Sequence, residues 1–476
     1  MRPGVLVTVE DAVPPRSAPT DVDTWFAVGI TEKGRTDPKL VRSMADFERQ
    51  YGKRIPDGIL YDCMDAYFRE GGAKAYVGRV IGDAATTAKL DVEPVTFKAQ
   101  GEGTWGNNLK LAVVDGLAED SIQVLITDAT TTKLLEASPE FLTKADLLAW
   151  QGQYVYVEDK TPATTTLPPA TASAPLAGGA DDYAGVDDAS WSAALDKLST
   201  EFGPGQVSAP GETTSAMHKT LLQHAYDKNR VALLDAPDNS TAAGLISAAL
   251  TVRSDPNARY GAMFTPRVLI PGVVPNTTRE VPYSPIQAGL IARSFDQLQP
   301  AAGVNGISRV ALDVKYAWTD EERYMLNEGG VDVARLMSGT VRTYGYRTLV
   351  DPYQLPQWVQ LNTVRVVMAV KAQCEVVGES HIFRIIDGRG IEISAFHADL
   401  VAVCIPFYEQ NALYGATPAE AFAVDTGPSI NTPETIAAGE LHANIKLRTS
   451  PFSEYVEINI IKVPLPATGQ DASLVS

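Results

Sequence analysis

The spacing of apolar residues predicts that helices and strands alternate along most of this chain. Residues 60–70 carry their large apolar side chains at helical spacing, and Gly71 follows as a helix stop because glycine enters the left-handed conformation without strain. A shorter helix around residues 46–48 ends at Gly52 by the same argument. Residues 75–80 then predict a strand. The segment therefore predicts a helix–helix–strand unit.

Over the next two hundred residues the pattern of apolar positions changes from one typical of strands to one typical of alternating strands and helices. Residues 92–157 alternate apolar and polar positions between glycine and aspartate turns, which predicts a small β domain. Residues 159–177 are rich in Thr, Pro and Ala, which is typical of a surface linker. The continuous apolar run 231–237 then predicts a strand buried on both faces of a parallel sheet, with a helix at 242–252. The central region is therefore predicted to be α/β.

The last quarter of the chain predicts two helices between strands. Residues 358–361 suggest a strand that leads into a helix capped by Asn362, although the valines of this helix also favour strands. A second helix spans 396–407, and Pro406 predicts a kink in it. The closing residues 455–462 alternate as a strand does.

The N-terminus has a similar pattern, because Val5, Val7 and Val9 alternate before a run of prolines. A short strand followed by an extended connector cannot stabilise itself. Its partner is either the edge of its own domain or another subunit, and the pattern leaves both open.

The amino-acid composition disfavours several classes of protein and of partner. A chain of 476 residues with 45% hydrophobic residues is long enough for two to four domains. The three cysteines lie among apolar neighbours without a C-x-x-C pair, so we expect reduced core residues in a protein made in the cytosol. We expect neither a signal peptide nor a membrane span, since no run of eighteen apolar residues occurs. A net charge of −18 disfavours nucleic acid as a partner and favours proteins.

Motifs for metal and nucleotide chemistry are missing. His218 and His224 are six residues apart, and no H-E-x-x-H motif occurs. The acidic stretch 178–188 does not have the spacing of a calcium loop and is better explained as a solvated turn. The glycine pairs at 71–72 and 329–330 are not followed by Lys-Ser or Lys-Thr, so they are interpreted as helix stops. We expect no cofactor.

Five segments together resemble one known family. They are the helix–Gly-Gly–strand unit at 46–80, the run VPYSPIQAGLIAR at 281–293, the pairs of motifs at 326–331 and 344–349, and the long run 412–447. This combination resembles the contractile tail sheath proteins of bacteriophages and related injection machines. Tyr344 stands where the family more often has tryptophan.

The resemblance implies a multidomain α/β (α+β) fold. Its parts are a central core described in the family as subtilisin-like, a C-terminal α+β domain, an inserted small β domain and two extended strand arms. The implied domains are an arm at 1–19, the N-terminal part of the core at 20–85, the β insertion and linker at 86–176, the central α/β domain at 177–350, the C-terminal domain at 351–462 and a tail at 463–476.

The resemblance also implies a structural function without enzymatic activity. Family members polymerise as stacked hexameric rings around an inner tube and contract from a metastable extended state without a fuel molecule. The implied partners are other copies of the chain, the tail tube, the baseplate and the tail terminator, with no nucleic acid and no membrane insertion. The implied location is the virion tail, after assembly in the host cytoplasm. The sheath of a bacteriocin or another injection system is the alternative.

A cytosolic subtilisin-like hydrolase is the remote alternative. It requires a serine, a histidine and an aspartate within hydrogen-bond reach. None of the five histidines lies in a His-Gly-Thr motif, and Ser215, the serine closest to His218, lacks the glycines of a nucleophile elbow. The sequence therefore disfavours a catalytic triad.

Assembly residues follow from the resemblance as hypotheses. The arm strands that would pair with neighbouring subunits contain Val5, Val7, Val9, Val456, Ile458 and Ile460. Because the family's C-terminal domain touches the tube, Arg365 and Lys371, on the expected exposed side of the helix after Asn362, are the candidate tube contacts. A solvated helix face is the alternative, since Glu375 and Glu379 lie close by.

Overall fold

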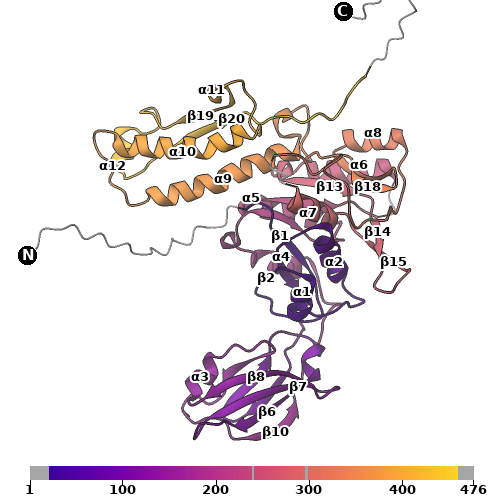
Figure 1. Cartoon of the computed structure of the whole chain (residues 1–476), viewed down its shortest axis with the longest axis vertical. Helices are drawn as coiled ribbons and strands as arrows, with labels where there is room; N and C mark the ends of the chain where they lie inside the picture. Colours follow the sequence, from indigo (N-terminus) through magenta and orange to yellow (C-terminus); the bar gives the residue numbers. More distant parts are fainter. Residues whose placement is uncertain (1–20, 239–240, 295–297, 459–476) are drawn as a thin grey trace, which may run out of the picture.

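The computed structural model describes residues 21–238, 241–294 and 298–458. Figure 1 shows a central domain, a β domain that projects from one end of it, and a pair of long helices that project from the other end. The mixed α/β architecture with several sheets agrees with the predicted fold class.

A sheet that has eight strands over the described residues forms the centre of the fold. Its strands are β1 (Trp25–Ile30), β2 (Lys39–Val41), β3 (Ala75–Val80), β11 (Gly205–Ser208), β12 (Arg230–Asp235), β13 (Gly261–Thr265), β17 (Val331–Met337) and β18 (Thr340–Thr343). The strands β3, β1, β11, β12, β13 and β17 run parallel in this spatial order. The strands β2 and β18 pair antiparallel at the two edges.

Helices cover both faces of this sheet. One face packs against α2 (Leu60–Glu70), α7 (Ser284–Arg293) and α9 (Leu361–His381). The other face packs against α4 (Asp188–Asp196), α5 (Ser215–Asp227), α6 (Ala242–Arg253) and α8 (Asp320–Glu328). Every residue of β12 is buried, which confirms the strand predicted at 231–237.

The N-terminal helix–helix–strand unit forms as predicted. The helix α1 (Met44–Tyr51) begins after Ser43, whose side chain accepts a hydrogen bond from the Asp46 amide, and it ends at Gly52 with φ +88°. Gly71 ends α2 in the left-handed conformation, with φ +118°. A Cβ on Gly72 would lie 2.2 Å from the Tyr67 ring, so this second glycine allows the turn to close against α2.

The β domain consists of two antiparallel sheets around one apolar core. The elements are β4 (Lys89–Val92), β5 (Val95–Ala99), η1 (Thr104–Asn108), β6 (Leu109–Asp115), β7 (Ile122–Asp128), β8 (Leu134–Phe141), α3 (Lys144–Ala149), β9 (Val155–Asp159) and β10 (Thr171–Pro175). The linker interpretation of residues 159–177 is wrong at β10, which pairs with β6. An edge strand needs backbone pairing rather than large apolar side chains, so the Thr, Pro and Ala composition concealed it.

The remaining elements connect or cap these domains. They are η2 (Thr200–Phe202), η3 (Ala258–Tyr260), β14 (Val268–Pro271), β15 (Thr278–Val281), β16 (Asp313–Val314), η4 (Pro356–Trp358), α10 (Ile391–Glu409), α11 (Pro418–Ala421), β19 (Phe422–Asp425), α12 (Pro433–Ala437) and β20 (Asn444–Leu447).

The C-terminal helices correct one prediction and confirm another. Residues 358–361 form no strand, because η4 ends at Trp358 and α9 begins at Leu361, after its N-cap Gln360. Asn362 therefore lies inside the helix instead of capping it. The predicted helix itself is confirmed, since packing against the central sheet overrides the strand preference of its valines.

Within the described residues, α10 is long and apolar enough to cross a membrane, with a mean hydropathy of 1.4 over eighteen residues. Val403, Cys404 and Phe407 of α10 join the same apolar core as α9. Packing within the C-terminal domain thus accounts for part of this hydropathy.

Arg365 fixes α9 to the edge of the central domain. Its side chain is fully buried, and its Nη1 donates to the carbonyl oxygen of Val22 at 3.0 Å and to Oε1 of Gln206 at 3.2 Å. Its Nη2 lies 3.3 Å from an oxygen of Asp23. The expected exposure of Arg365 is wrong, because residues 361–366 of α9 are buried on every side and this part of the helix has no solvent face.

We predict that Arg365→Met destabilises the folded chain by about 3 kcal/mol, since it removes a buried charged donor from the Val22 carbonyl and from Gln206, both of which are buried. Lys371→Met, the same change on the exposed side of the same helix, is the control and is expected to stay within about 0.5 kcal/mol of wild type. Urea unfolding followed by tryptophan fluorescence measures both. Equal unfolding midpoints for the two variants would show that Arg365 does not anchor the helix.

Candidate assembly surfaces

The two-stranded sheet of the C-terminal domain has two open edges. β19 and β20 pair antiparallel, with Phe422 opposite Leu447 and Val424 opposite Ile445. These four side chains pack toward the core, whereas Lys446 on the other face is exposed. Among the described residues, no third strand pairs with either edge.

The register shows which backbone groups face outward. The Arg448 amide donates to the carbonyl oxygen of Ala421 at 2.9 Å, and these residues lie directly opposite each other in the extended register. Hydrogen-bonded and non-hydrogen-bonded pairs alternate in an antiparallel ladder, so the amide and carbonyl groups of Val424 and Ile445 point away from each other. Each edge therefore offers a template for an added strand.

The structure describes only two of the six predicted arm residues. Val5, Val7, Val9 and Ile460 fall outside the described residues. Val456 and Ile458 are 72% and 78% exposed, and residues 455–458 form no strand. The strand predicted at 455–462 is therefore wrong over its described part. Its alternating pattern has no partner strand within the described chain, and an unpaired strand is not stable.

Gln360 and the first two turns of α9 contact residues near both ends of the described chain. Gln360 donates to the carbonyl oxygen of Phe452 at 3.0 Å and accepts from the Phe452 amide at 3.2 Å. Arg347 forms an ion pair with Glu454. Arg365, less than two turns beyond Gln360, binds Val22 and Asp23 at the other end of the described chain. Residues near both ends of the described chain therefore lie close to the start of one helix.

The two candidate tube-contact residues differ in exposure. Arg365 is buried, whereas Lys371 is exposed and lies 3.8 Å from Glu375 one turn later. An exposed apolar tip, missed by the sequence analysis, lies between α9 and α10. It contains Ile382, Phe383 and Ile385, with the exposed Arg384 among them and the exposed Arg389 after them. The signal was the run IFRII at 382–386, whose apolar residues follow no helical period.

A crevice of about 260 Å³ lies where α/β sheets usually bind ligands, at the carboxyl ends of β1 and β11. The lining includes Asp57, Glu212 and Arg267 but no Ser, Cys, His or Lys. The lining therefore lacks the serine and histidine that a subtilisin-like hydrolase requires.

Ser284 and Asp235 meet near this edge of the sheet, but their arrangement is structural. Ser284 is fully buried, and its hydroxyl donates to Asp235 at 2.7 Å. Asp235 also accepts from the Ser284 and Gly211 amides, which fixes the start of α7 to a turn. Burial lowers the pKa of His218 to about 4, and its ring contacts the Glu212 carbonyl at 3.3 Å. No histidine side chain in the described ranges hydrogen-bonds to a serine.

The described residues also contain no group of three or more His, Cys, Asp or Glu side chains arranged to hold a metal ion. The described geometry thus offers surfaces for assembly and no assembled catalytic centre.

No family model and no curated protein matches the sequence. Solved structures do match it closely in fold. The sheath tail protein from Listeria innocua has a TM-score of 0.63 at 12% identity, with 91% of this chain and 96% of that chain covered. The sheath tail protein from Desulfitobacterium hafniense has a TM-score of 0.55 at 14% identity, with 89% and 93% covered. This chain has the fold of a tail sheath protein.

The sheath fold is also that of contractile injection systems. The helical sheath of the anti-feeding prophage in its contracted state has a TM-score of 0.57 at 15% identity, with 96% of this chain and 98% of that chain covered. These alignments span nearly all of each chain.

We predict that Val424→Pro abolishes polymer formation while the folded chain persists, because proline removes an outward amide donor without breaking the β19–β20 pair. Val424→Ala is the control, since it shortens the same side chain and keeps the amide. Sedimentation of each purified variant measures polymer. If V424P sedimented like V424A, this edge would not receive a strand.

Proposed function

We propose that this chain is the structural subunit of a contractile tail sheath. In this proposal it polymerises as stacked hexameric rings around an inner tube, is held in a metastable extended state, and contracts to drive the tube through the envelope of the target cell. Its partners are other copies of itself, the tube protein, the baseplate and the tail terminator. Assembly takes place in the host cytoplasm, and the final location is the tail.

The observation that carries the proposal is the match over almost the full length to sheath proteins, among them one solved as a contracted helical sheath. The open edges of β19 and β20 support it, since they can receive strands from neighbouring subunits. The contacts of the start of α9 with residues near both ends of the described chain support the proposal as well. In the proposal, residues 6–10 pair with a neighbour's C-terminal sheet, and the terminal strand completes the exchange.

The proposed mechanism is a bistable lattice. Contacts in the contracted state are more favourable than contacts in the extended state, and a barrier separates the two. Backbone hydrogen bonds of an added strand do not depend on side-chain packing elsewhere, so strand exchange keeps neighbours connected while domains rotate. The proline-rich connector at 14–19 supplies the slack that such rotation needs.

The domain division 1–19, 20–85, 86–176, 177–350, 351–462 and 463–476 belongs to this proposal, as does a subtilisin-like origin of the central core. A fold shared with subtilisin does not by itself imply catalytic activity. The buried Ser284–Asp235 pair and the described histidines support a non-enzymatic role.

Tube contact is proposed for the exposed part of the α9–α10 pair. Lys371 remains a candidate, whereas the buried Arg365 serves as an anchor in this conformation. The apolar tip at 382–386 is a further candidate, because exposed apolar residues together with arginine are typical of protein interfaces.

A sheath tail protein and the sheaths of contractile injection systems share this fold at similar TM-scores. The comparisons therefore support the sheath function in general, and the sheath of a bacteriocin or injection system stays the alternative to the phage tail.

The proposal predicts that the purified chain forms hollow tubes or stacked rings in negative-stain electron microscopy. Deletion of residues 1–15 is expected to abolish them, since the N-terminal arm strand is lost. Circular dichroism and size-exclusion chromatography check that the truncated chain is folded and monomeric. Tubes formed by the truncated chain would contradict the arm exchange. Monodisperse wild-type particles at every salt and protein concentration would contradict self-assembly.

A further inference from the structure

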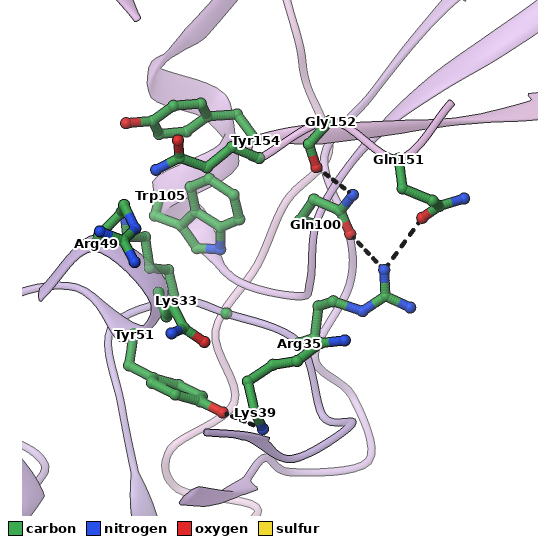
Figure 2. Close-up of a pocket in the computed structure, with 13 residues that line it drawn as sticks. Lys33, Arg35, Lys39, Arg49, Tyr51, Gln100, Trp105, Gln151, Gly152 and Tyr154 are labelled. Atoms are coloured by element: carbon green, nitrogen blue, oxygen red, sulfur yellow. Dashed lines mark hydrogen bonds between the residues drawn. The ribbon is translucent and has the colours of Figure 1, made fainter. Parts of the chain in front are cut away.

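A basic pocket of about 260 Å³ opens between the central domain and the β domain. Its walls come from distant parts of the sequence: the loop after β1, the end of α1, the residues around η1, and the loop before β9. Figure 2 shows Lys33, Lys39 and Arg49 on one side, with Trp105 and Tyr154 facing them.

The lining carries positive charge without a carboxylate. Lys33, Arg35, Lys39 and Arg49 line the pocket, and the lining contains no Asp or Glu. Arg35 and Arg49 have carboxylate partners outside the lining, whereas Lys33 and Lys39 form no ion pair with any described residue. In a chain with a net charge of −18, such a site attracts an acidic group.

Lys33 lies at the centre of this site. Its Nζ is 5.7 Å from the centroid of the Trp105 ring and 5.3 Å from that of Tyr154, within the range of cation–π interaction. Burial lowers the pKa of the Lys33 ammonium. A bound carboxylate would offset that desolvation cost, and the two rings offer apolar surface beside it.

The pocket wall is held in place by hydrogen bonds across the two domains. Arg35 donates to Gln100 at 2.9 Å and to Gln151 at 3.1 Å, as drawn in Figure 2. Gln100 in turn donates to the Gly152 carbonyl at 2.7 Å. A wall fixed in this way loses little conformational freedom when a partner binds.

The β6–β7 loop of the same chain has the complementary chemistry. Leu117 at its tip is fully exposed, and Glu119 and Asp120 follow it on the surface. Glu140 accepts hydrogen bonds from the amides of Leu117 at 3.0 Å and Ala118 at 3.1 Å, which fixes the loop. The loop therefore presents an apolar side chain next to two carboxylates.

Loop and pocket lie at opposite ends of β6. Trp105 comes before this strand and the loop follows it, so seven residues of extended strand separate them by about 20 Å. The loop cannot reach the pocket of its own chain. A contact between the loop of one copy and the pocket of the next is heterologous, the kind that builds open polymers.

We propose that the β6–β7 loop of one subunit binds in the basic pocket of its neighbour, with Leu117 against Trp105 and Tyr154 and with Glu119 and Asp120 facing Lys33 and Lys39. This inference rests on the proposed function, since it requires that copies of the chain polymerise. It assigns the β domain a role as a charge-selective connector between subunits.

Charge reversal with rescue tests the contact. Lys39→Glu and Glu119→Lys, both at exposed positions, are each expected to raise the protein concentration needed for polymerisation about fivefold. The double variant restores the pair with reversed sign and is expected to return within about twofold of wild type. Lys133→Glu, an exposed change of the same charge on the β7–β8 turn, is the matched control and is expected to have no effect.

A second variant, Leu117→Ala, tests the apolar part. It is expected to raise the polymerisation threshold without changing the melting temperature, because its side chain touches nothing in the free chain.

Failure of the contact is distinguishable from failure of the sheath function. If wild type polymerises but the double variant is no better than the worse single variant, the loop and the pocket do not meet. A small anion that filled the pocket in place of the loop would give the same result and would equally overturn the contact. If wild type does not polymerise at all, the proposed function fails and this inference falls with it.

Discussion

The buried guanidinium of Arg365 sets the geometry on which the other features depend. It links α9 to Gln206 of the central sheet and to Val22 and Asp23, where the described chain begins. A buried charge is tolerated only when its donors are satisfied, so the helix, the sheet and the start of the chain hold one another in place. Gln360 ties the C-terminal segment to the same helix. The start of α9 therefore holds residues near both ends of the described chain.

Local signals predicted the parts of the fold whose causes are local. Gly52 and Gly71 ended the first two helices at the expected places, and the continuous apolar run at 231–237 marked a strand covered on both faces. Predictions failed where partners are distant. The edge strand β10 was taken for a linker because it depends on pairing with β6 and not on its own apolar residues. The helix α9 was predicted correctly, although its valines also favour strands, and packing against the central sheet decides its conformation.

Less of the candidate surfaces than of the fold could be predicted from the sequence. Arg365 was expected on a solvent face because a periodic stripe marks only one buried side, whereas α9 is buried on all sides at its start. The alternation at 455–458 predicted a strand, but no described segment pairs with these residues and they form none in the described chain. The basic pocket draws on loops more than one hundred residues apart, so no sequence motif marks it.

The central claim is that neighbouring subunits complete the sheet begun by β19 and β20. A helical cryo-electron microscopy reconstruction of the assembled polymer tests it most directly. The account predicts a four-stranded sheet, in which one added strand comes from the N-terminal arm of one neighbour and the other from the C-terminal arm of another. A polymer in which β19 and β20 remain a two-stranded sheet would contradict it.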